Sequence, residues 1–361
     1  MIAHKSTELS TDMDSGVVER CVYERQLHMF NVFSLQEAKA FGAEKWEVER
    51  AVGCCLERLY RACYFVNRTC TKHTQFNRFA EPEILRLTGE ASSAGKGRAW
   101  FGLQEKKHLG KAEFIGRRLS HGDVVSHTTA ALIHGLPVLS IPHKVQLINP
   151  SRSRSGERFT RRQRQLRPAE ETVQWNSIPV TDPVRTVLDI ATDISLEQAV
   201  AAFDALLRSE PVKAQGRKHA AREIIAANAK FSASMRVVKL MEYSTGLAES
   251  FGESVCMVVI RNLGIKGLVQ QADIVDENGE FVARVDGLIP DKRIIIEFDG
   301  SVKYRDTAAG GINERGDQFM LEKQREHRLH VLGYTVVRIM WSDLQNPLQL
   351  KARLAAVGAL G

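Results

Sequence analysis

Three acidic residues stand near the ends of two apolar segments in the last third of the chain. Asp286 lies within EFVARVDGLI, and Glu297 and Asp299 end RIIIEFD. Because Glu297 and Asp299 are two residues apart in an extended segment, both side chains are expected on one face. Charges close to a core need a partner, and Mg²⁺ or Mn²⁺ bound by carboxylate oxygens is one such partner. We therefore predict a metal site at Asp286, Glu297 and Asp299, with Glu253 as a further acid.

The surrounding pattern predicts the elements that would position these acids. Apolar residues recur at helical spacing up to Gly264, and the later segments alternate or run continuously as strands do. The expected order is helix, two hairpin-paired strands, helix and strand, at residues 247–265, 280–289, 293–299, 316–333 and 334–341. In the alternative interpretation the acids are solvated strand ends that pair with Arg284 and Lys292.

These segments carry a set of short motifs spread over roughly the final 110 residues. The set resembles Vsr-like and restriction-endonuclease-like proteins of the PD-(D/E)XK superfamily. The resemblance implies phosphodiester hydrolysis, with Mg²⁺ held by Asp286 and Glu297. The matching residues are Ser250, Glu253 and Ser254; Arg284, Val285 and Asp286; Glu297 to Gly300; Lys303 and Tyr304; Glu322, Lys323, Arg325 and Glu326; and Leu329, Gly333, Tyr334, Val336, Val337 and Arg338.

The chain departs from that superfamily at one catalytic position. A lysine usually stands two residues after the second acid, whereas this chain has Asp299 there. Lys303 or Lys323 could supply the ammonium group instead, and Asp299 could be a metal ligand. The candidate catalytic residues are Asp286, Glu297, Asp299, Lys303 and Glu253. The alternative is a domain that keeps the fold and has lost the reaction.

An arginine-rich stretch, SRSRSGERFTRRQRQLR, lies in the middle of the chain with Glu157 as its single acid. Guanidinium groups suit phosphate contacts, so we predict nucleic-acid binding, most readily of DNA. A solvated hairpin is the alternative. The candidate DNA-binding residues are Arg152, Arg154, Arg158, Arg161, Arg162, Arg164 and Arg167.

Charge is unevenly distributed along the chain. Of 50 Lys+Arg and 43 Asp+Glu residues, 14 basic and 16 acidic ones lie from Gly246 onward. The first 245 residues therefore carry a net charge of +9 and the remainder −2. This division favours an anion-binding region in front of a carboxylate-bearing domain, and we expect the two to be separable near Gly246.

The region from Asp123 to about Arg208 reads as one unit. A helix ending at Gly135, the strand KVQLIN, an arginine-rich hairpin and the helix LEQAVAAFDALLR follow one another. A turn into a helix carries the pattern T-x-P-x-R-T-x-x-D at Thr181, Pro183, Arg185, Thr186 and Asp189. The region resembles AbiEi-type antitoxin-like regulators, which implies a toxin or other protein as a partner.

The sequence pattern of the N-terminal part predicts a loosely ordered arm, then two short helices broken at Gly42, and then a strand or wing. Such an order is typical of a winged helix. SSAGKGR, near residues 92–98, is interpreted as a flexible basic linker because it departs from a phosphate-binding loop in spacing and in its last residue. The predicted α/β (α+β) chain comprises an arm at 1–33, a winged-helix-like domain at 34–110, an AbiEi-like region with a helical connector at 111–245, and a restriction-endonuclease-like mixed sheet flanked by helices at 246–361.

The six cysteines lack the spacing of a disulfide scaffold or a zinc ribbon, so we interpret them as reduced thiols. Cys63, Cys70 and His73 could contribute to a metal site, but the set lacks a fourth ligand. The sequence shows neither a signal peptide nor an apolar stretch long enough to cross a membrane, which predicts a cytoplasmic protein without membrane contact.

Two functions remain open. One is a DNA-binding, metal-dependent endonuclease. The other is a non-catalytic, antitoxin-like transcriptional regulator that keeps a degenerate nuclease fold.

Overall fold

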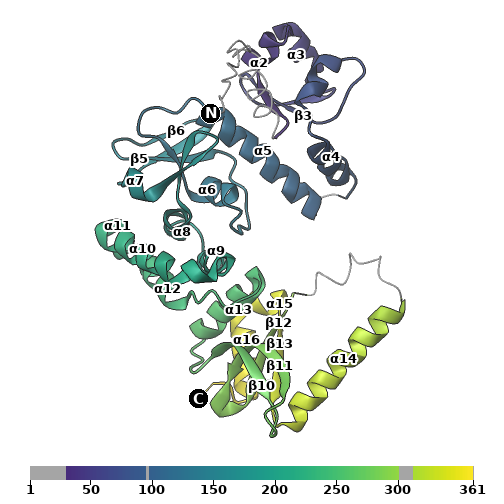
Figure 1. Ribbon diagram of the computed structural model, residues 1–361, viewed down its shortest axis with the longest axis vertical. Helices are drawn as coiled ribbons and strands as arrows, with labels where there is room; N and C mark the ends of the chain where they lie inside the picture. Colours follow the sequence, from purple (N-terminus) through teal and green to yellow (C-terminus); the bar gives the residue numbers. More distant parts are fainter. Residues whose placement is uncertain (1–29, 95–96, 301–311, 361) are drawn as a thin grey trace, which may run out of the picture. The chain divides into compact units, whose positions relative to one another are not determined.

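The computed structural model describes residues 30–94, 97–300 and 312–360. The predicted N-terminal arm, apart from its last four residues, and Lys303 and Tyr304 lie outside the described residues. The chain is α/β, as the sequence predicts (Figure 1). It divides into two compact units, and the chain passes between them more than once. The first holds Met1–Val125, Ile141–Arg164 and Gln174–Val180, and the second holds Ser126–Ser140, Gln165–Val173 and Thr181–Gly361.

The first unit begins with a small three-stranded sheet in the order β1-β3-β2. Ser34 caps the first helix through a capping box with Glu37, and Gly42 in the left-handed region separates that helix from the next. Phe33, Phe76 and Phe79 stack in the core beneath them. The elements of this part are β1 (Val32–Ser34), α2 (Leu35–Ala40), α3 (Lys45–Ala51), β2 (Leu56–Tyr60), β3 (Cys63–Val66), η1 (Thr74–Phe79), α4 (Pro82–Ala94) and α5 (Arg98–Gly116).

A six-stranded mixed sheet follows, in the order β6-β7-β5-β4-β9-β8. Helix α5 packs against β5, and at its end Gly116 lies so close to Ile178 that a Cβ would collide with that side chain. The strands, with the short helices among them, are β4 (Val124–Val125), α6 (His127–Ile133), β5 (Val145–Asn149), β6 (Arg154–Ser155), β7 (Phe159–Gln163), α7 (Pro168–Glu171), β8 (Thr172–Trp175) and β9 (Ile178–Thr181).

Helices form the first part of the second unit. Asp182 caps α8 by accepting hydrogen bonds from the N–H groups of Val184 and Arg185. An apolar core joins α6, α8, α9, α10 and α12, with Phe203 and Phe231 among its largest buried side chains. These helices are α8 (Pro183–Ala191), α9 (Leu196–Ser209), η2 (Pro211–Lys213), α10 (Ala214–Ala227), α11 (Ala229–Ser232) and α12 (Met235–Tyr243).

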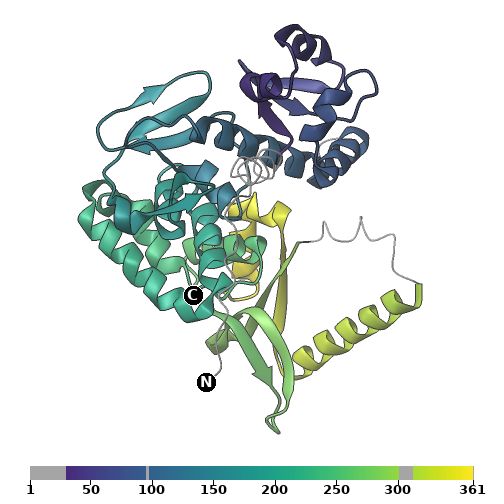
Figure 2. The same ribbon diagram turned by 45° about the horizontal axis from the view of Figure 1, so that its top comes forward.

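The C-terminal region contains a four-stranded sheet in the order β10-β11-β12-β13 (Figure 2). The first three strands are antiparallel and the last pair is parallel. One apolar cluster joins the sheet to α13 and α16, and a second, which includes Leu329 of α14, lies against β11 and β12. The elements are α13 (Phe251–Asn262), β10 (Val269–Val275), β11 (Phe281–Ile289), η3 (Pro290–Lys292), β12 (Ile294–Asp299), α14 (Ile312–Val331), β13 (Thr335–Met340), α15 (Trp341–Leu344) and α16 (Pro347–Ala356).

Most predicted elements are confirmed, and the differences have physical causes. The helix predicted from Val124 begins instead at His127, because Val124 and Val125 pair with β5 and Val125 also pairs with β9. Strand β10 was not predicted. The linker prediction is only partly right, since α4 continues to Ala94. None of the described helices combines the length and the apolar character needed to cross a membrane.

Candidate functional site

Strands β11 and β12 and helix α13 position the acidic residues Asp286, Glu297 and Glu253. Strands β11 and β12 are antiparallel with Gly287 opposite Ile296, so Asp286 and Glu297 lie one step further along that ladder. Ser250 caps α13, which places Glu253 in its first turn. Gly252 packs so closely against the ring of Phe298 that any Cβ there would collide with it. A glycine at this position therefore lets the start of α13 approach the end of β12.

Gln271 on β10 joins two of the acids. Its side-chain amide donates to Oε2 of Glu253 at 3.2 Å and to Oδ1 of Asp286 at 3.4 Å. The other oxygen of Asp286 accepts from the backbone N–H of Phe298 at 2.9 Å. Oε2 of Glu253 also accepts from the N–H of Glu249 at 2.7 Å. Two carboxylates from different elements thus converge on one amide group.

The environment of Asp286 disfavours its charged form. Burial raises the pKa of Asp286 to about 6, and the nearby charges of Glu253 and Glu297 act in the same direction. The hydrogen bonds from the Phe298 N–H and from Gln271 lower the pKa, but they do not outweigh burial. The site therefore holds a carboxylate that would gain from a cation.

Glu297 already has cationic partners. Its Oε1 accepts a hydrogen bond from the Arg325 guanidinium of α14, and Nε of Arg338 on β13 lies 3.9 Å from its other oxygen. Glu322 bridges the same two arginines, at 3.2 Å from Arg325 and 2.6 Å from Arg338. Glu297 of β12 is thus part of an ion-pair network that joins β12, α14 and β13. This network was not predicted from the sequence.

The remaining predicted residues are dispersed. Asp299 is half-buried at the end of β12, opposite Met340 of β13. Lys323 is exposed on α14, and Lys303 lies outside the described residues. Within the described ranges, the acids do not form a group of three whose oxygens all lie within 4.8 Å of one another. The cation beside Glu297 is Arg325 and not a lysine.

The arginine-rich stretch forms the predicted hairpin, with Arg154 opposite Arg161. Its arginines differ in environment. Arg161 is buried and pairs with Asp123 at 2.5 Å, which makes it part of the interior. Arg167 pairs with Glu170 and Glu171. Arg162 and Arg164 are half-buried, and the exposed members of the hairpin are Arg152, Arg154 and Arg158.

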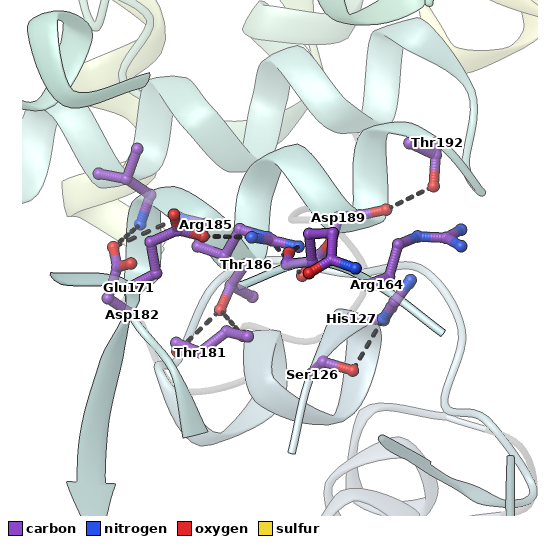
Figure 3. Close-up of polar contacts among 12 residues, drawn as sticks. Ser126, His127, Arg164, Glu171, Thr181, Asp182, Arg185, Thr186, Asp189 and Thr192 are labelled. Carbon is purple, nitrogen blue, oxygen red and sulfur yellow. Dashed lines mark hydrogen bonds and ion pairs between the residues drawn. The ribbon is translucent and has the colours of Figure 1, made fainter. Parts of the chain in front are cut away.

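The turn from Thr181 into α8 holds a buried polar network (Figure 3). Arg185 is only 1% exposed and pairs with Glu171 and with Asp189, the latter at 3.2 Å. Its guanidinium also donates to the carbonyl of Gln165 and lies over the ring of Phe231. Their burial and mutual pairing give these motif residues a structural role.

The hydroxyls of Thr181 and Thr186 lie 2.7 Å apart in the same part of the molecule, and Thr186 also donates to the Thr181 carbonyl. These bonds join the end of β9 to the first turn of α8. The two motif threonines therefore help to fix the turn that presents Arg185 to its partners.

The cysteine residues are arranged differently from the sequence-based grouping. Cys63 is fully buried in β3, away from Cys70 and His73, which instead lie beside Cys54 and Cys55. Among the described residues this is the group of potential metal ligands whose donor atoms all lie within 4.8 Å of one another. The sequence analysis had already grouped Cys70 with His73, and the adjacent pair Cys54 and Cys55 was the signal that it passed over.

Comparison with known proteins finds relatives without a stated activity. No family model matches the chain. Over 291 aligned residues it is 25% identical to uncharacterized proteins of Mycobacterium tuberculosis from the strains CDC 1551 / Oshkosh and ATCC 25618 / H37Rv. The alignment covers 75% of this chain and 95% of each relative. The similarity extends over most of both proteins, and function has to be argued from the geometry.

Proposed function

We propose that the C-terminal sheet supports a metal-dependent phosphodiesterase of the endonuclease type, and that DNA is the substrate. The observation that carries this proposal is the convergence of Asp286 and Glu253 on Gln271, one strand away from Glu297. Oxygen donors from separate elements, in a half-buried position at the end of a sheet, suit a hard divalent cation.

The donor set fits Mg²⁺ or Mn²⁺ at two of the proposed positions. Asp286 and Glu253 would hold the ion, because each has a carboxylate oxygen that only an amide or N–H group contacts. Glu297 would join them on release from Arg325, and Asp299 is a further proposed ligand. A cation at this place would acidify the attacking water and neutralise charge on the phosphate.

Arg325 has a role in this proposal that the sequence did not suggest. A guanidinium stays protonated at all working pH values, so it can neutralise phosphate charge but cannot accept a proton. Arg325 is held by Glu297 and Glu322, and a phosphodiester could replace Glu297 as its partner. Lys303, suggested by the resemblance to PD-(D/E)XK proteins, remains the proposed ammonium donor.

DNA affinity is proposed to come from the hairpin of β6 and β7. Arg152, Arg154 and Arg158 are exposed on it, and phosphate contacts of this kind position a duplex without reading its sequence. A cytoplasmic location is part of the proposal.

The test is cleavage of supercoiled plasmid in Mg²⁺ or Mn²⁺. Nicked circles are expected with the wild type, and they should be absent with EDTA, with Asp286→Asn and with Glu253→Gln. Asp291→Asn removes an exposed acid of η3 and is the matched control, which should cleave like the wild type. Lys303→Ala should keep a metal-dependent rise in melting temperature and lose only cleavage, because a charge-stabilising group acts mostly in the transition state.

A non-catalytic, antitoxin-like regulator is the second candidate, and the ion pairs of Glu297 favour it. Glu297 is only 14% exposed and bound by two arginines, an arrangement that stabilises a scaffold as well as it could serve catalysis. DNA binding without cleavage of any DNA or RNA, together with no melting shift in Mg²⁺ or Mn²⁺, would support this candidate. In that case the proposed partner is a toxin or another protein.

A further inference from the structure

Four side chains that bind soft metals meet in the first unit. Cys54 and Cys55 follow α3, and Cys70 and His73 lie in the segment between β3 and η1. The two pairs are separated along the chain by the β2–β3 hairpin. We propose that Cys54, Cys55, Cys70 and His73 bind one Zn²⁺ ion in a structural site.

The distances between these donor atoms match a tetrahedral zinc site. Zinc–sulfur bonds of about 2.3 Å and zinc–nitrogen bonds of about 2.05 Å, at tetrahedral angles, place two sulfurs about 3.8 Å apart and sulfur and nitrogen about 3.6 Å apart. Sγ of Cys54 and Sγ of Cys70 are 3.8 Å apart. Nδ1 of His73 lies 3.7 Å from Sγ of Cys55 and 3.6 Å from Sγ of Cys70.

The composition of the group selects the metal. Three sulfurs and one imidazole are soft and borderline ligands, which favour Zn²⁺ over Mg²⁺ or Ca²⁺. Four protein ligands leave no open position on a tetrahedral ion, and this is the pattern of structural rather than catalytic zinc. The site is therefore distinct in chemistry and in purpose from the carboxylates of the C-terminal sheet.

Neighbouring groups hold the ligand segments in place. Asn77 accepts from the N–H of Cys70 at 2.9 Å and donates to its carbonyl at 3.2 Å. Nε of Arg68 donates to the carbonyl of Cys54 at 2.9 Å, and Nη2 lies 4.0 Å from Sγ of Cys54. Three thiolates around Zn²⁺ carry a net negative charge, which this guanidinium would partly offset. Such surrounding contacts are typical of metal sites.

The position of the ion explains what it would do. Zinc would fasten the turn after α3 to the segment after β3 and so close the base of the β2–β3 hairpin. The core beneath is small, and Cys55 is itself part of it. A metal bound only in the folded state adds its binding free energy to the folding free energy.

The experiment uses the full chain, purified under reducing conditions. Elemental analysis should find about one zinc per chain. After removal of zinc, added Co²⁺ should produce the visible absorption of tetrahedral cobalt with thiolate ligands. Cys54→Ser and Cys70→Ser should each lose most of the bound metal. Cys63→Ala is the matched control, because it removes a buried thiol of the same unit that is not a proposed ligand.

A second measurement keeps the proposal testable if the variants do not fold. Titration of wild-type apoprotein with Zn²⁺ against a chromophoric chelator reports the affinity directly, and a thiol-modifying reagent should release the ion. A wild-type protein that neither contains zinc nor takes up Co²⁺ overturns the proposal. So does equal metal content in Cys70→Ser and the wild type, or a Cys54–Cys70 disulfide as the native state, seen as a mass lower by two hydrogens. None of these results bears on plasmid cleavage.

Discussion

At the scale of single residues, the most informative positions are charges that the fold has taken out of water. Asp286 is one whose environment opposes ionisation, whereas Arg185 is one whose charge is fully paired. The two cases predict opposite effects on stability. Removing the charge of Asp286 should stabilise the protein, and removing that of Arg185 should destabilise it.

Asp286→Asn is expected to raise stability at neutral pH. The folded-state pKa of about 6 lies above the value of an unfolded aspartate, so the stability contribution is present at low pH and is lost as pH rises through about 6. Without divalent metal, the variant should exceed the wild type by about 2 kcal/mol at pH 8, and the difference should shrink as the pH falls towards 4. Urea denaturation at several pH values measures it. A variant less stable than the wild type at pH 8 would contradict this account.

Arg185→Met should lower the free energy of unfolding by about 3–5 kcal/mol, because it removes the buried cation that the carboxylates of Glu171 and Asp189 share. Arg167→Met is the matched control. Arg167 pairs with the same Glu171 but is 43% exposed, so its loss should lower the free energy of unfolding far less than the loss of Arg185. Thermal and urea unfolding of both variants make the comparison. Similar losses for both would mean that the Arg185 network is not the stabilising feature.

At the scale of elements, the β6–β7 hairpin carries one arginine that pairs in the interior and others that are exposed to solvent. Arg161 of β7 faces inward to Asp123, whereas the exposed arginines are Arg154 on β6 and Arg152 and Arg158 on the segments beside the strands. Arg154 lies directly opposite Arg161, and the difference in burial follows the position of the strands, because β6 is the edge strand of the sheet whereas β7 lies between β6 and β5. Arg161 thus anchors the hairpin to the interior, and Arg152, Arg154 and Arg158 are exposed to solvent.

Replacing Arg152, Arg154 and Arg158 together by Gln should weaken DNA binding and reduce its salt dependence. Each phosphate contact contributes about 0.9 to the slope of log affinity against log salt, so the slope should fall by up to about 3. Fluorescence anisotropy with a duplex at several salt concentrations gives both quantities. The control replaces three exposed basic residues elsewhere by Gln, namely Arg222, Lys230 and Lys266. Equal losses in both variants would indicate that net charge, and not the hairpin, determines affinity.

At the scale of the whole molecule, the segment near Gly246 lies inside the second unit, where it links the helical region to the C-terminal sheet. Asp204 of α9 accepts hydrogen bonds from the N–H groups of Thr245 and Gly246, at 2.8 and 2.7 Å, and from the hydroxyl of Ser254 at 2.9 Å. Asp204 is 1% exposed, and burial raises its pKa. Helix α9 therefore fixes the start of the C-terminal region.

A fragment of residues 246–361 should be less stable than a fragment of residues 196–361, which retains α9. Hydrogen bonds to charged groups each contribute about 1.5–3 kcal/mol, so the loss of Asp204 should cost about 3 kcal/mol or more. Circular dichroism melts of the two fragments test this. Asp204→Ala in the longer fragment should reproduce much of the difference. Equal melting temperatures would instead restore Gly246 as the boundary of an independent domain, as the charge distribution predicts.

The sequence alone was sufficient for the α/β class and for most of the strands and helices around Asp286 and Glu297. Apolar periodicity is a local property, and it survives in a single sequence. The strand β10 was missed because the adjacent polar residues Gln270 and Gln271 break the apolar alternation of VQQADIV, and in the fold Gln271 has a left-handed backbone there. Local pattern also cannot report that Val124 and Val125 are held in a sheet by distant strands.

Only the tertiary structure decided which charged and sulfur-bearing side chains meet. Asp286 joins Glu253 through Gln271, and Glu297 pairs with Arg325, although Asp286 and Glu297 looked equivalent as acids at the ends of strands. Cys54 and Cys55 reach Cys70 across a hairpin, in place of Cys63. Residue type and spacing determine what chemistry is available. Partners are determined by the packing of segments far apart in the chain, because electrostatic and coordination energies depend on distances that only the fold sets.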